Sequence, residues 1–559
     1  MSRADYTVQN LVDKIEAGEL RLPEMQRKYV WSATRVRDLL DSLYRGYPSG
    51  IILAWESDET VATQAFAVES KAISGVRPLL LLDGQQRLTS LSAVLGGKPV
   101  TVRRRERPID ILFNLEHPEE LTYVTDVQED SNEEGLNDFE SGDMDIQERF
   151  RRMTFVVASR ALEALPHWIR VTDIFKKSDA DILPGTGLSG WDDPKYQMYT
   201  DRLKAVRAIR DYQYRMDILE RTKSYEEVTE IFVRVNSLGA KLRSSDLALA
   251  QITAKWRGSL EIFQKFQTEI EKTGFNLDLG IILKTLIAVI TNQSKFLSVN
   301  SLSYKDLETG WKRTKEALTH ALNFLKENLG IDSPSLLSSP FLIVTTAYWS
   351  DKRPYQITSQ EREEFSKWFL LANAKGRYSR GSTETLLDQD LAVIRDGGEI
   401  ANLLQRLTQQ VGRLDFTSEE LVGRTSRSGA FKTMFLAFRQ DNARDWATSL
   451  EISPKHSGKS DAIEYHHIFP KAYLKKQRTD IDRYAIDDIA NLAFIGSKTN
   501  KIIGDKAPSK YRENFEAPDL ADQLIVFTEG LDTADAFERF VAKRRAAIAL
   551  KLNQFLGVG

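Results

Sequence analysis

The feature that most constrains this chain is a pair of adjacent histidines, His466 and His467, in the segment EYHHIFP at residues 464–470. A second apolar segment follows at residues 489–495, and a polar, basic segment, SKTNK, follows that at 497–501. The first two segments predict short strands, and the third predicts the start of a helix. Neighbouring side chains of a strand point to opposite faces, so the two histidines cannot share one metal ion. They can instead serve as one metal ligand and one base.

The same region is basic. From His466 to Arg512 the chain has ten Lys or Arg against five Asp, a net charge of +5, whereas the whole chain has a net charge of −3. A solvated charged surface would account for the excess alone, but a local positive charge also suits a phosphate backbone. The side chains expected to contact DNA are Lys471, Lys498, Lys501 and Lys506.

The order of strand, loop, strand and Asn-bearing helix resembles the ββα-metal fold of HNH nucleases. The resemblance rests on His-His-Ile-x-Pro, on Asn491 with the adjacent Leu492, and on Asn500. It implies that His467 is the general base, that His466 and Asn500 hold one metal ion, and that Asn491 keeps the base or its loop in place as part of the catalytic set. An isolated histidine pair would indicate only two partly buried side chains; the combined pattern favours a nuclease.

The chemistry is consistent with these residue types. A histidine, with an ordinary pKa of about 6.5, can take a proton from water at cellular pH. A divalent metal adds Lewis acidity. An amide oxygen at position 500 suits Mg²⁺ or Mn²⁺ better than Zn²⁺.

A second motif lies near the amino terminus, where Leu79 to Leu82 precede Asp83-Gly84-Gln85-Gln86-Arg87. This predicts a strand, a turn and a helix. The helix start can bind an anion, Gly84 allows a close approach and Arg87 can bind phosphate bidentately. Asp83 can hold Mg²⁺ or polarise water, which Gln85 or Gln86 can orient. No Walker A motif is present, and a plain capped turn is the alternative.

Other segments accompany this motif: residues 22–31 (LPEMQRKYVW), 47–50 (YPSG) and 231–239 (IFVRVNSLG). Together they resemble the ParB/sulfiredoxin-like amino-terminal domain of GmrSD-type enzymes, in which a fused HNH domain is the single-chain architecture. The helical middle is matched only through residues 377–382. The resemblance implies an NTPase in which Asp83 and Gln86 are catalytic and the nucleotide-binding set is Arg27, Asp83, Gly84, Gln85, Gln86, Arg87, Thr89 and Asn236.

We therefore expect an α-rich α+β protein in three parts. Residues 1–255 form a ParB-like α/β NTPase and DNA-sensing domain, 256–415 a helical connection, and 416–559 the HNH domain with flanking helices. Expected helices in the middle include 147–165, 199–214, 260–273, 307–329 and 361–374. Residues 116–148 hold thirteen acidic residues and no Lys or Arg, which indicates a solvated insertion or, alternatively, a mimic of nucleic acid.

Composition excludes several classes. The chain has no cysteine and 6 histidines, which excludes disulfides, zinc ribbons, iron–sulfur clusters and thiol nucleophiles. The most apolar run, residues 279–291, is short and contains Lys284, so we expect a buried helix and not a membrane span. The amino terminus has no signal-type apolar stretch, and we expect a cytoplasmic protein.

The resemblance implies a type IV restriction enzyme that cuts modified phage DNA, for example DNA with hydroxymethylated or glucosylated cytosine. Its expected cofactors are Mg²⁺ or Mn²⁺ and an NTP (GTP, ATP or UTP), and its expected partner is double-stranded DNA, with a homodimer as one possible assembly. One alternative is an NTP-dependent nickase that senses phosphorothioate DNA. Another is a nucleotide-dependent DNA-binding regulator with an inactive nuclease.

Overall fold

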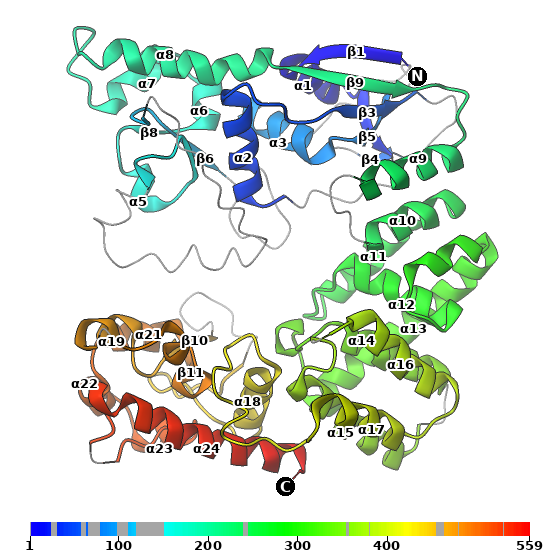
Figure 1. Cartoon of the computed structure of the whole chain (residues 1–559), viewed down its shortest axis with the longest axis vertical. Coiled ribbons are helices and arrows are strands. Elements are labelled where there is room, and N and C mark those ends of the chain that lie inside the picture. The colour runs from blue at the N-terminus through cyan, green and yellow to red at the C-terminus, as the bar shows by residue number, and fades with distance from the viewer. Residues whose placement is uncertain are drawn as a thin grey trace. The chain divides into compact units, whose positions relative to one another are not determined.

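The computed structural model describes residues 2–23, 31–56, 63–64, 79–97, 110–118, 150–238, 244–353, 357–379, 381–453, 463–478, 480–528 and 530–558 (Figure 1). Its contacts divide the chain into unit 1, Met1–Leu260, and unit 2, Glu261–Gly559. The helix-rich α+β class is confirmed, with small sheets in both units. The finer division into three domains stays a prediction.

Unit 1 contains a six-stranded sheet in the order β1-β9-β3-β5-β2-β4. In it, β5 runs parallel to β2 and antiparallel to β3, and β3 runs parallel to β9. The strands are β1 (Ser2–Thr7), β2 (Leu20–Pro23), β3 (Ile52–Trp55), β4 (Thr63–Gln64), β5 (Leu79–Asp83) and β9 (Gln213–Leu219).

The leucine run of β5 explains the position of this strand inside the sheet. Leu81 joins the core on one face, with the partly buried Leu79 packed against it. Leu80 and Leu82 join a separate cluster on the other face. Because alternate side chains are buried on both faces, an unbroken apolar run is expected, as for an interior strand. The prediction of a strand here, followed by a helix, is confirmed.

A three-stranded sheet in the order β7-β6-β8 adds to unit 1; its strands are β6 (Ile111–Asn114), β7 (Phe155–Val157) and β8 (Trp168–Arg170). The α-helices of this unit are α1 (Val8–Glu16), α2 (Ala33–Tyr44), α3 (Gln85–Leu95), α5 (Arg160–Glu163), α6 (Val171–Lys176), α7 (Asp179–Ile182), α8 (Tyr196–Arg207), α9 (Tyr225–Leu238) and α10 (Ser244–Lys255). Short 3₁₀ turns are η2 (Leu183–Thr186) and η3 (Ala208–Asp211).

Unit 2 begins with helices, and a small strand pair, β10 (Ile463–His467) and β11 (Leu492–Gly496), lies in its carboxyl-terminal part, followed by further helices (Figure 1). Its first helices are α11 (Ser259–Glu271), α12 (Leu279–Thr291), α13 (Tyr304–Leu329), α14 (Phe341–Lys352), α15 (Ser359–Lys375), α16 (Thr383–Arg395), α17 (Ile400–Val411) and α18 (Gly429–Gln440), with 3₁₀ turns η4 (Phe296–Ser301) and η5 (Pro334–Leu336). Among them α14 packs against α12, α13, α15 and α16.

The rest of unit 2 contains β10 (Ile463–His467), α19 (Lys471–Gln477), α20 (Arg483–Ile486), η6 (Ile489–Asn491), β11 (Leu492–Gly496), α21 (Ser497–Ile503), α22 (Pro508–Tyr511), η7 (Arg512–Asn514), α23 (Ala517–Ala521), η8 (Ala534–Ala536) and α24 (Phe537–Leu556). The long α24 packs against α18 and η6. These contacts join the strand pair to the helical part of the same unit.

Most predicted helices are present, but two predictions need correction. Three predicted helices correspond to α11, α13 and α15, and the apolar run 279–291 forms the buried α12. The predicted helix 147–165 is wrong where it is described, because Phe155 to Val157 form the strand β7. The predicted helix 199–214 ends early, because the chain turns at residues 208–211 and enters β9.

Two other findings bear on earlier expectations. No helix among the described segments combines the length and the apolar character that a membrane crossing needs. The acidic residues 119–148 lie outside the described residues, so their role stays a prediction.

Arg377 and Tyr378, the first two residues of the 377–382 segment, have a structural role. Arg377 donates from Nε and Nη2 to the two carboxylate oxygens of Asp390, at 2.9 and 2.8 Å. Tyr378 also donates to Asp390, and Gln410 accepts from Arg377. Because Arg377 and Asp390 are fully buried, this network links the end of α15 to α16 and α17.

Candidate active site

Two antiparallel strands and a helix form the framework of the site. Strand β10 pairs with β11, so that His466 lies opposite Ala493 and His467 opposite Leu492. Helix α21 follows β11 directly and carries Asn500. The predicted order of strand, strand and helix is present, although Asn491 lies in a 3₁₀ turn before β11 and not within the strand.

His467 is held by a carboxylate that the sequence did not single out. Its Nε2 atom lies 2.9 Å from Oδ1 of Asp487. Lys471 contacts the same oxygen at 2.8 Å, and its side chain is 39% exposed. The hydrogen bond from His467 holds the pKa of Asp487 well below its usual range, against burial, with Lys471 adding to the effect. Asp487 is therefore ionised near neutral pH and can only accept hydrogen bonds.

His466 and Asn500 lie together, as the metal-ligand prediction requires. The Asn500 side chain interacts with the imidazole of His466. The Nε2 atom of His466 is buried without a well-formed hydrogen bond to any described residue. Burial, and then the nearby His467, lower the pKa of His466 to about 4. The ring is therefore neutral near pH 7, and a neutral imidazole has one nitrogen lone pair that can bind a metal ion.

Asn491 holds the loop that follows the histidine strand. Its Oδ1 accepts from the amide of Phe469 at 2.9 Å, and its Nδ2 donates to the carbonyl of Ile486 at 3.0 Å. Its carbonyl also accepts from the amide of Ile468 at 2.8 Å. Asn491 is fully buried, so its geometry is that of a positioning residue.

Helix α21 is fixed at its start by Asp445, which lies 51 residues before Gly496. Gly496 has no side chain that could cap the helix; instead, its amide donates to Asp445 at 2.6 Å, and the Thr499 hydroxyl donates at 2.7 Å. The hydroxyl and amide of Thr448 donate as well. Burial would raise the pKa of Asp445, but these hydrogen bonds outweigh burial and hold it below the usual range. Asp445 therefore positions the helix that carries Asn500.

Two further side chains support β11. The buried guanidinium of Arg544, on α24, donates to the carbonyls of Ala490 and Leu492 at 2.9 and 2.8 Å. Gln523 exchanges two hydrogen bonds with the backbone of Phe494, as a neighbouring strand would. Arg544 and Gln523 both bond to backbone groups, which every residue has. The sequence therefore contained no sign of their partners, and neither residue was predicted.

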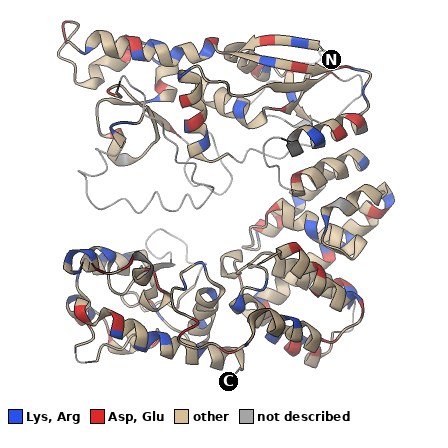
Figure 2. Ribbon diagram, viewed as in Figure 1, with Lys and Arg blue, Asp and Glu red and all other residues tan. Residues whose placement is uncertain are grey.

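The predicted DNA-binding lysines lie around this framework. Lys498 and Lys501 are exposed on α21, and Lys506 is exposed just beyond it. Figure 2 shows basic positions on α19 and α21. Lys471 differs from the other three because it pairs with Asp487. DNA contact by all four stays a prediction.

The amino-terminal motif forms a second polar site, in unit 1. Gly84 follows β5 with a φ of +98°, and a Cβ atom there would lie 2.5 Å from Cδ1 of Ile52. The backbone conformation therefore favours glycine, and a side chain at this position would also have to displace the Ile52 methyl group. The Asp83 side chain is 40% exposed, and its Oδ2 atom lies 3.2 Å from Nη2 of Arg87.

The guanidinium group of Arg87 already makes hydrogen bonds to backbone carbonyls of the same unit. It donates to the carbonyls of Ser49 and Ile51, at 2.6 and 2.8 Å. Ser49 also donates hydrogen bonds to the hydroxyl groups of Tyr212, just before β9, and of Tyr214, in β9. Arg87 thus fixes the 49–51 loop beside the turn, a structural role that the sequence did not indicate.

The remaining predicted nucleotide-binding residues differ in position. Gln86 accepts a hydrogen bond from the Trp31 amide at 3.2 Å, while Gln85 and Thr89 are buried. Arg27 lies outside the described residues. Asn236 lies in α9, but its side chain is not described.

Among the described residues, no group of three or more His, Asp or Glu side chains could hold a metal ion. The pair His466 and Asn500 is smaller than such a group. A metal bound there would have two protein ligands and would complete its coordination with substrate or solvent oxygens.

Comparison with known proteins supports the family resemblance. Residues 8–253 match the family described as "GmrSD restriction endonuclease, N-terminal domain". A relative from Methanocaldococcus jannaschii, the uncharacterized protein MJ0686, is 23% identical over 553 residues, which cover 90% of this chain and 85% of that protein. The matched family domain includes the Asp83–Arg87 turn and ends before the histidine strand.

Proposed function

We propose, from the premise that this chain is a GmrSD-like protein by its residues 8–253, that it is a DNA endonuclease whose cleavage site is the β10–β11–α21 framework. One observation carries the proposal: His467 is bonded to Asp487, while the adjacent His466 lies beside Asn500. This brings together an oriented base and two candidate metal ligands on neighbouring elements. The arrangement resembles the HNH pattern of the sequence.

The hydrogen bond to Asp487 assigns the proton-accepting atom. An ionised carboxylate only accepts, so Nε2 of His467 carries the hydrogen. The lone pair is then on Nδ1, which takes the proton of the attacking water. After the transfer the imidazolium is stabilised by Asp487, as in other base–carboxylate pairs.

His466 and Asn500 would hold Mg²⁺ or Mn²⁺. Such an ion supplies Lewis acidity to the phosphate and to the leaving 3′ oxygen. Asn491 keeps the 468–470 loop fixed, and Asp445 and Arg544 keep α21 and β11 fixed. Rigid support of this kind matters because small displacements of the reacting groups lower the reaction rate strongly.

We propose that the substrate is modified double-stranded DNA, cut in phage defence. We also propose that an NTP bound at the Asp83–Arg87 turn regulates the cleavage. Support comes from the amino-terminal family and from the start of α3, where amide groups can bind phosphate. Because Arg87 is bonded to Ser49 and Ile51, a bound phosphate would also stabilise the 49–51 loop. Sensing of phosphorothioate DNA with nicking is the second candidate for this architecture.

The test is cleavage by the purified full chain. Plasmid DNA and a panel of phage DNAs with different cytosine modifications are incubated with Mg²⁺ or Mn²⁺, with and without GTP, ATP or UTP, and with EDTA as the blank. We expect divalent-dependent cuts in a modified DNA and fewer in its unmodified match. Absence of cleavage across the whole panel in both metals would refute the nuclease assignment, and cuts in phosphorothioate-free plasmid alone would favour the second candidate.

A further inference from the structure

A tyrosine that the proposed mechanism does not use lies against the backbone that carries the candidate base. Tyr511, the last residue of α22, is fully buried, and its hydroxyl donates to the carbonyl of Ile468 at 2.6 Å. Ile468 directly follows His467 and is itself fully buried. Burial raises the pKa of the Tyr511 hydroxyl above its ordinary range, so the hydroxyl keeps its proton and donates at neutral pH.

The hydrogen bond from Tyr511 completes the support of one peptide group. The Phe469 amide belongs to the same peptide group as the Ile468 carbonyl, and it donates to Oδ1 of Asn491 at 2.9 Å. The Ile468 amide, in the preceding peptide group, donates to the Asn491 carbonyl at 2.8 Å. These three hydrogen bonds hold the two peptide groups that follow His467, and Tyr511 supplies the one that does not come from Asn491.

Aromatic neighbours fix the ring of Tyr511. Trp446 is stacked against it, with the ring centres 6.5 Å apart and the planes 12° apart. Phe515 meets it edge-on, with the ring centres 6.2 Å apart. Trp446 directly follows Asp445, whose carboxylate holds the start of α21. Tyr511 therefore links the support of the candidate base to the support of the helix that carries Asn500.

We propose that Tyr511 is a positioning residue for DNA cleavage, which holds the backbone after His467 so that the imidazole stays bonded to Asp487. The proposal rests on the proposed function. The Tyr511 hydroxyl lies in the protein interior and bonds to a backbone carbonyl, so it acts through His467 and does not touch the DNA. Without the hydroxyl, the buried Ile468 carbonyl loses this donor, and the backbone there can turn toward another. A small displacement of the base then lowers the rate strongly.

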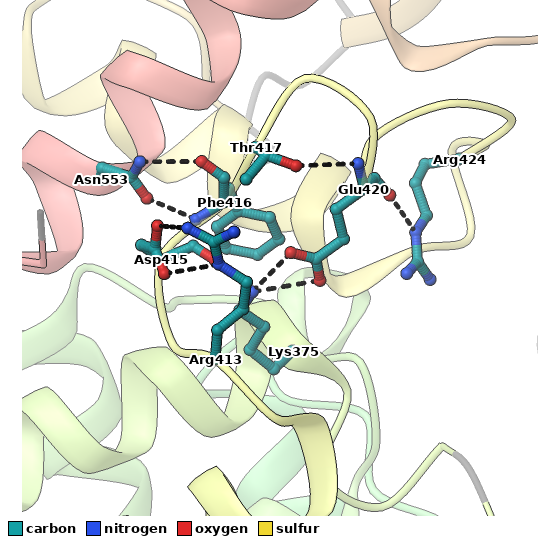
Figure 3. A network of polar contacts seen from close by, with 8 residues as sticks. All are labelled: Lys375, Arg413, Asp415, Phe416, Thr417, Glu420, Arg424 and Asn553. Carbon is teal, nitrogen blue, oxygen red and sulfur yellow. Dashed lines mark hydrogen bonds and ion pairs between the residues drawn. The ribbon is translucent and has the colours of Figure 1, made fainter.

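The test is Tyr511→Phe in the full-length protein, which removes the hydroxyl and keeps the ring between its aromatic neighbours. Tyr473→Phe is the matched control, because the Tyr473 hydroxyl accepts from the Ala534 amide at 3.2 Å, a contact that involves no residue of the 467–469 segment. A second control, Asn553→Ala, removes the two hydrogen bonds, at 2.7 and 2.9 Å, that hold the Phe416 backbone to α24 (Figure 3). It shows what a loss of stability in unit 2 alone does to cleavage.

Two readouts separate positioning from a merely structural role. The first is the kcat and KM of DNA cleavage with Mg²⁺ or Mn²⁺, measured well below the melting temperature of every variant, together with the affinity for a DNA duplex in EDTA. The second places Tyr511→Phe in a His467→Ala protein and follows single-turnover cleavage with the protein in excess. Two residues that act through one group have non-additive effects, so the tyrosine substitution should change the rate little once the base is gone.

We expect Tyr511→Phe to lower kcat roughly tenfold, with KM and DNA affinity unchanged, while both controls keep the parental kcat. In the His467→Ala protein the same substitution should change the residual rate by less than about twofold. A parental kcat in Tyr511→Phe, an equal loss in Asn553→Ala, or an undiminished further loss in the His467→Ala protein would overturn the proposal. Parental cleavage by His467→Ala itself would refute the proposed function and this proposal with it, so the two failures are distinguishable.

Discussion

Asp487 accepts a hydrogen bond from Nε2 of His467 at 2.9 Å and also contacts Lys471. This relationship fixes the tautomer of the candidate base and leaves Nδ1 as its proton acceptor. A histidine–carboxylate pair 20 residues apart is not visible as a sequence motif, because the spacing depends on the intervening helices α19 and α20.

Replacing Asp487 by Asn should lower kcat for DNA cleavage by roughly 10–100-fold with little change in KM, because the base loses its orientation while the DNA-binding surface is kept. Single-turnover and steady-state cleavage assays measure kcat and KM. Asp480→Asn is the control, since Asp480 is an exposed carboxylate paired with Arg478. If the Asp487 variant keeps the parental kcat, the orientation role is wrong.

Asp445→Ala should lower the free energy of unfolding by roughly 3 kcal/mol, because it leaves the Gly496 amide and the Thr499 hydroxyl without their buried acceptor. Cleavage should fall as well, since α21 carries Asn500. Urea unfolding and nicking assays are compared with Asp441→Ala, which removes an exposed carboxylate paired with Lys551. An unchanged unfolding midpoint would show that the cap contributes little.

Stability should also depend on pH through Asp445. Its pKa is lower in the folded chain than its ordinary value of about 3.9, so its contribution is present above that value and is lost as the pH falls through the folded pKa. Asp445→Asn lacks this titration. Unfolding followed between about pH 5 and about pH 2 should therefore show a shallower loss of stability in the variant than in the parent, and parallel curves would rule the titration out.

Arg87→Ala and Asp83→Asn should each reduce NTP hydrolysis by about 10²-fold or more if this turn binds the phosphates. Because Arg87 also holds Ser49 and Ile51, its variant should melt at a lower temperature, whereas Asp83→Asn should not. Hydrolysis of GTP, ATP and UTP is measured for both. Arg215→Ala, at an exposed arginine of β9 paired with Asp217, is the control, and parental hydrolysis in both turn variants would remove the nucleotide site from this motif.

Much of the local structure could be predicted, because it depends on short-range patterns. The leucine run before Asp83 predicted β5, the histidine segment predicted β10, and the apolar run 279–291 predicted α12. The prediction of one helix over residues 199–214 was wrong at its end, because a single series of apolar residues spans the end of α8 and the start of β9. In β9 the side chains of Tyr214 and Met216 are buried at alternate positions.

The supporting residues of the site could not be predicted, for a physical reason. Asp445, Gln523 and Arg544 bond mainly to backbone amides and carbonyls, which every residue has, so no complementary side chain marks their partners. Their roles appear only when segments far apart in the chain are brought together. By contrast, His466, His467 and Asn500 are chemically distinctive at short spacing, and the structure places the predicted ligand pair together.

The most direct test of the account is DNA cleavage by His467→Ala in the full chain, measured beside NTP hydrolysis on the same preparation. The control is His320→Ala, at an exposed histidine of α13 in the same unit. Loss of the base should reduce cleavage by about 10²–10⁴-fold and leave NTP hydrolysis unchanged, while the control keeps both. Near-parental nicking by a correctly folded His467→Ala protein would contradict the assignment of β10, β11 and α21 as the cleavage site.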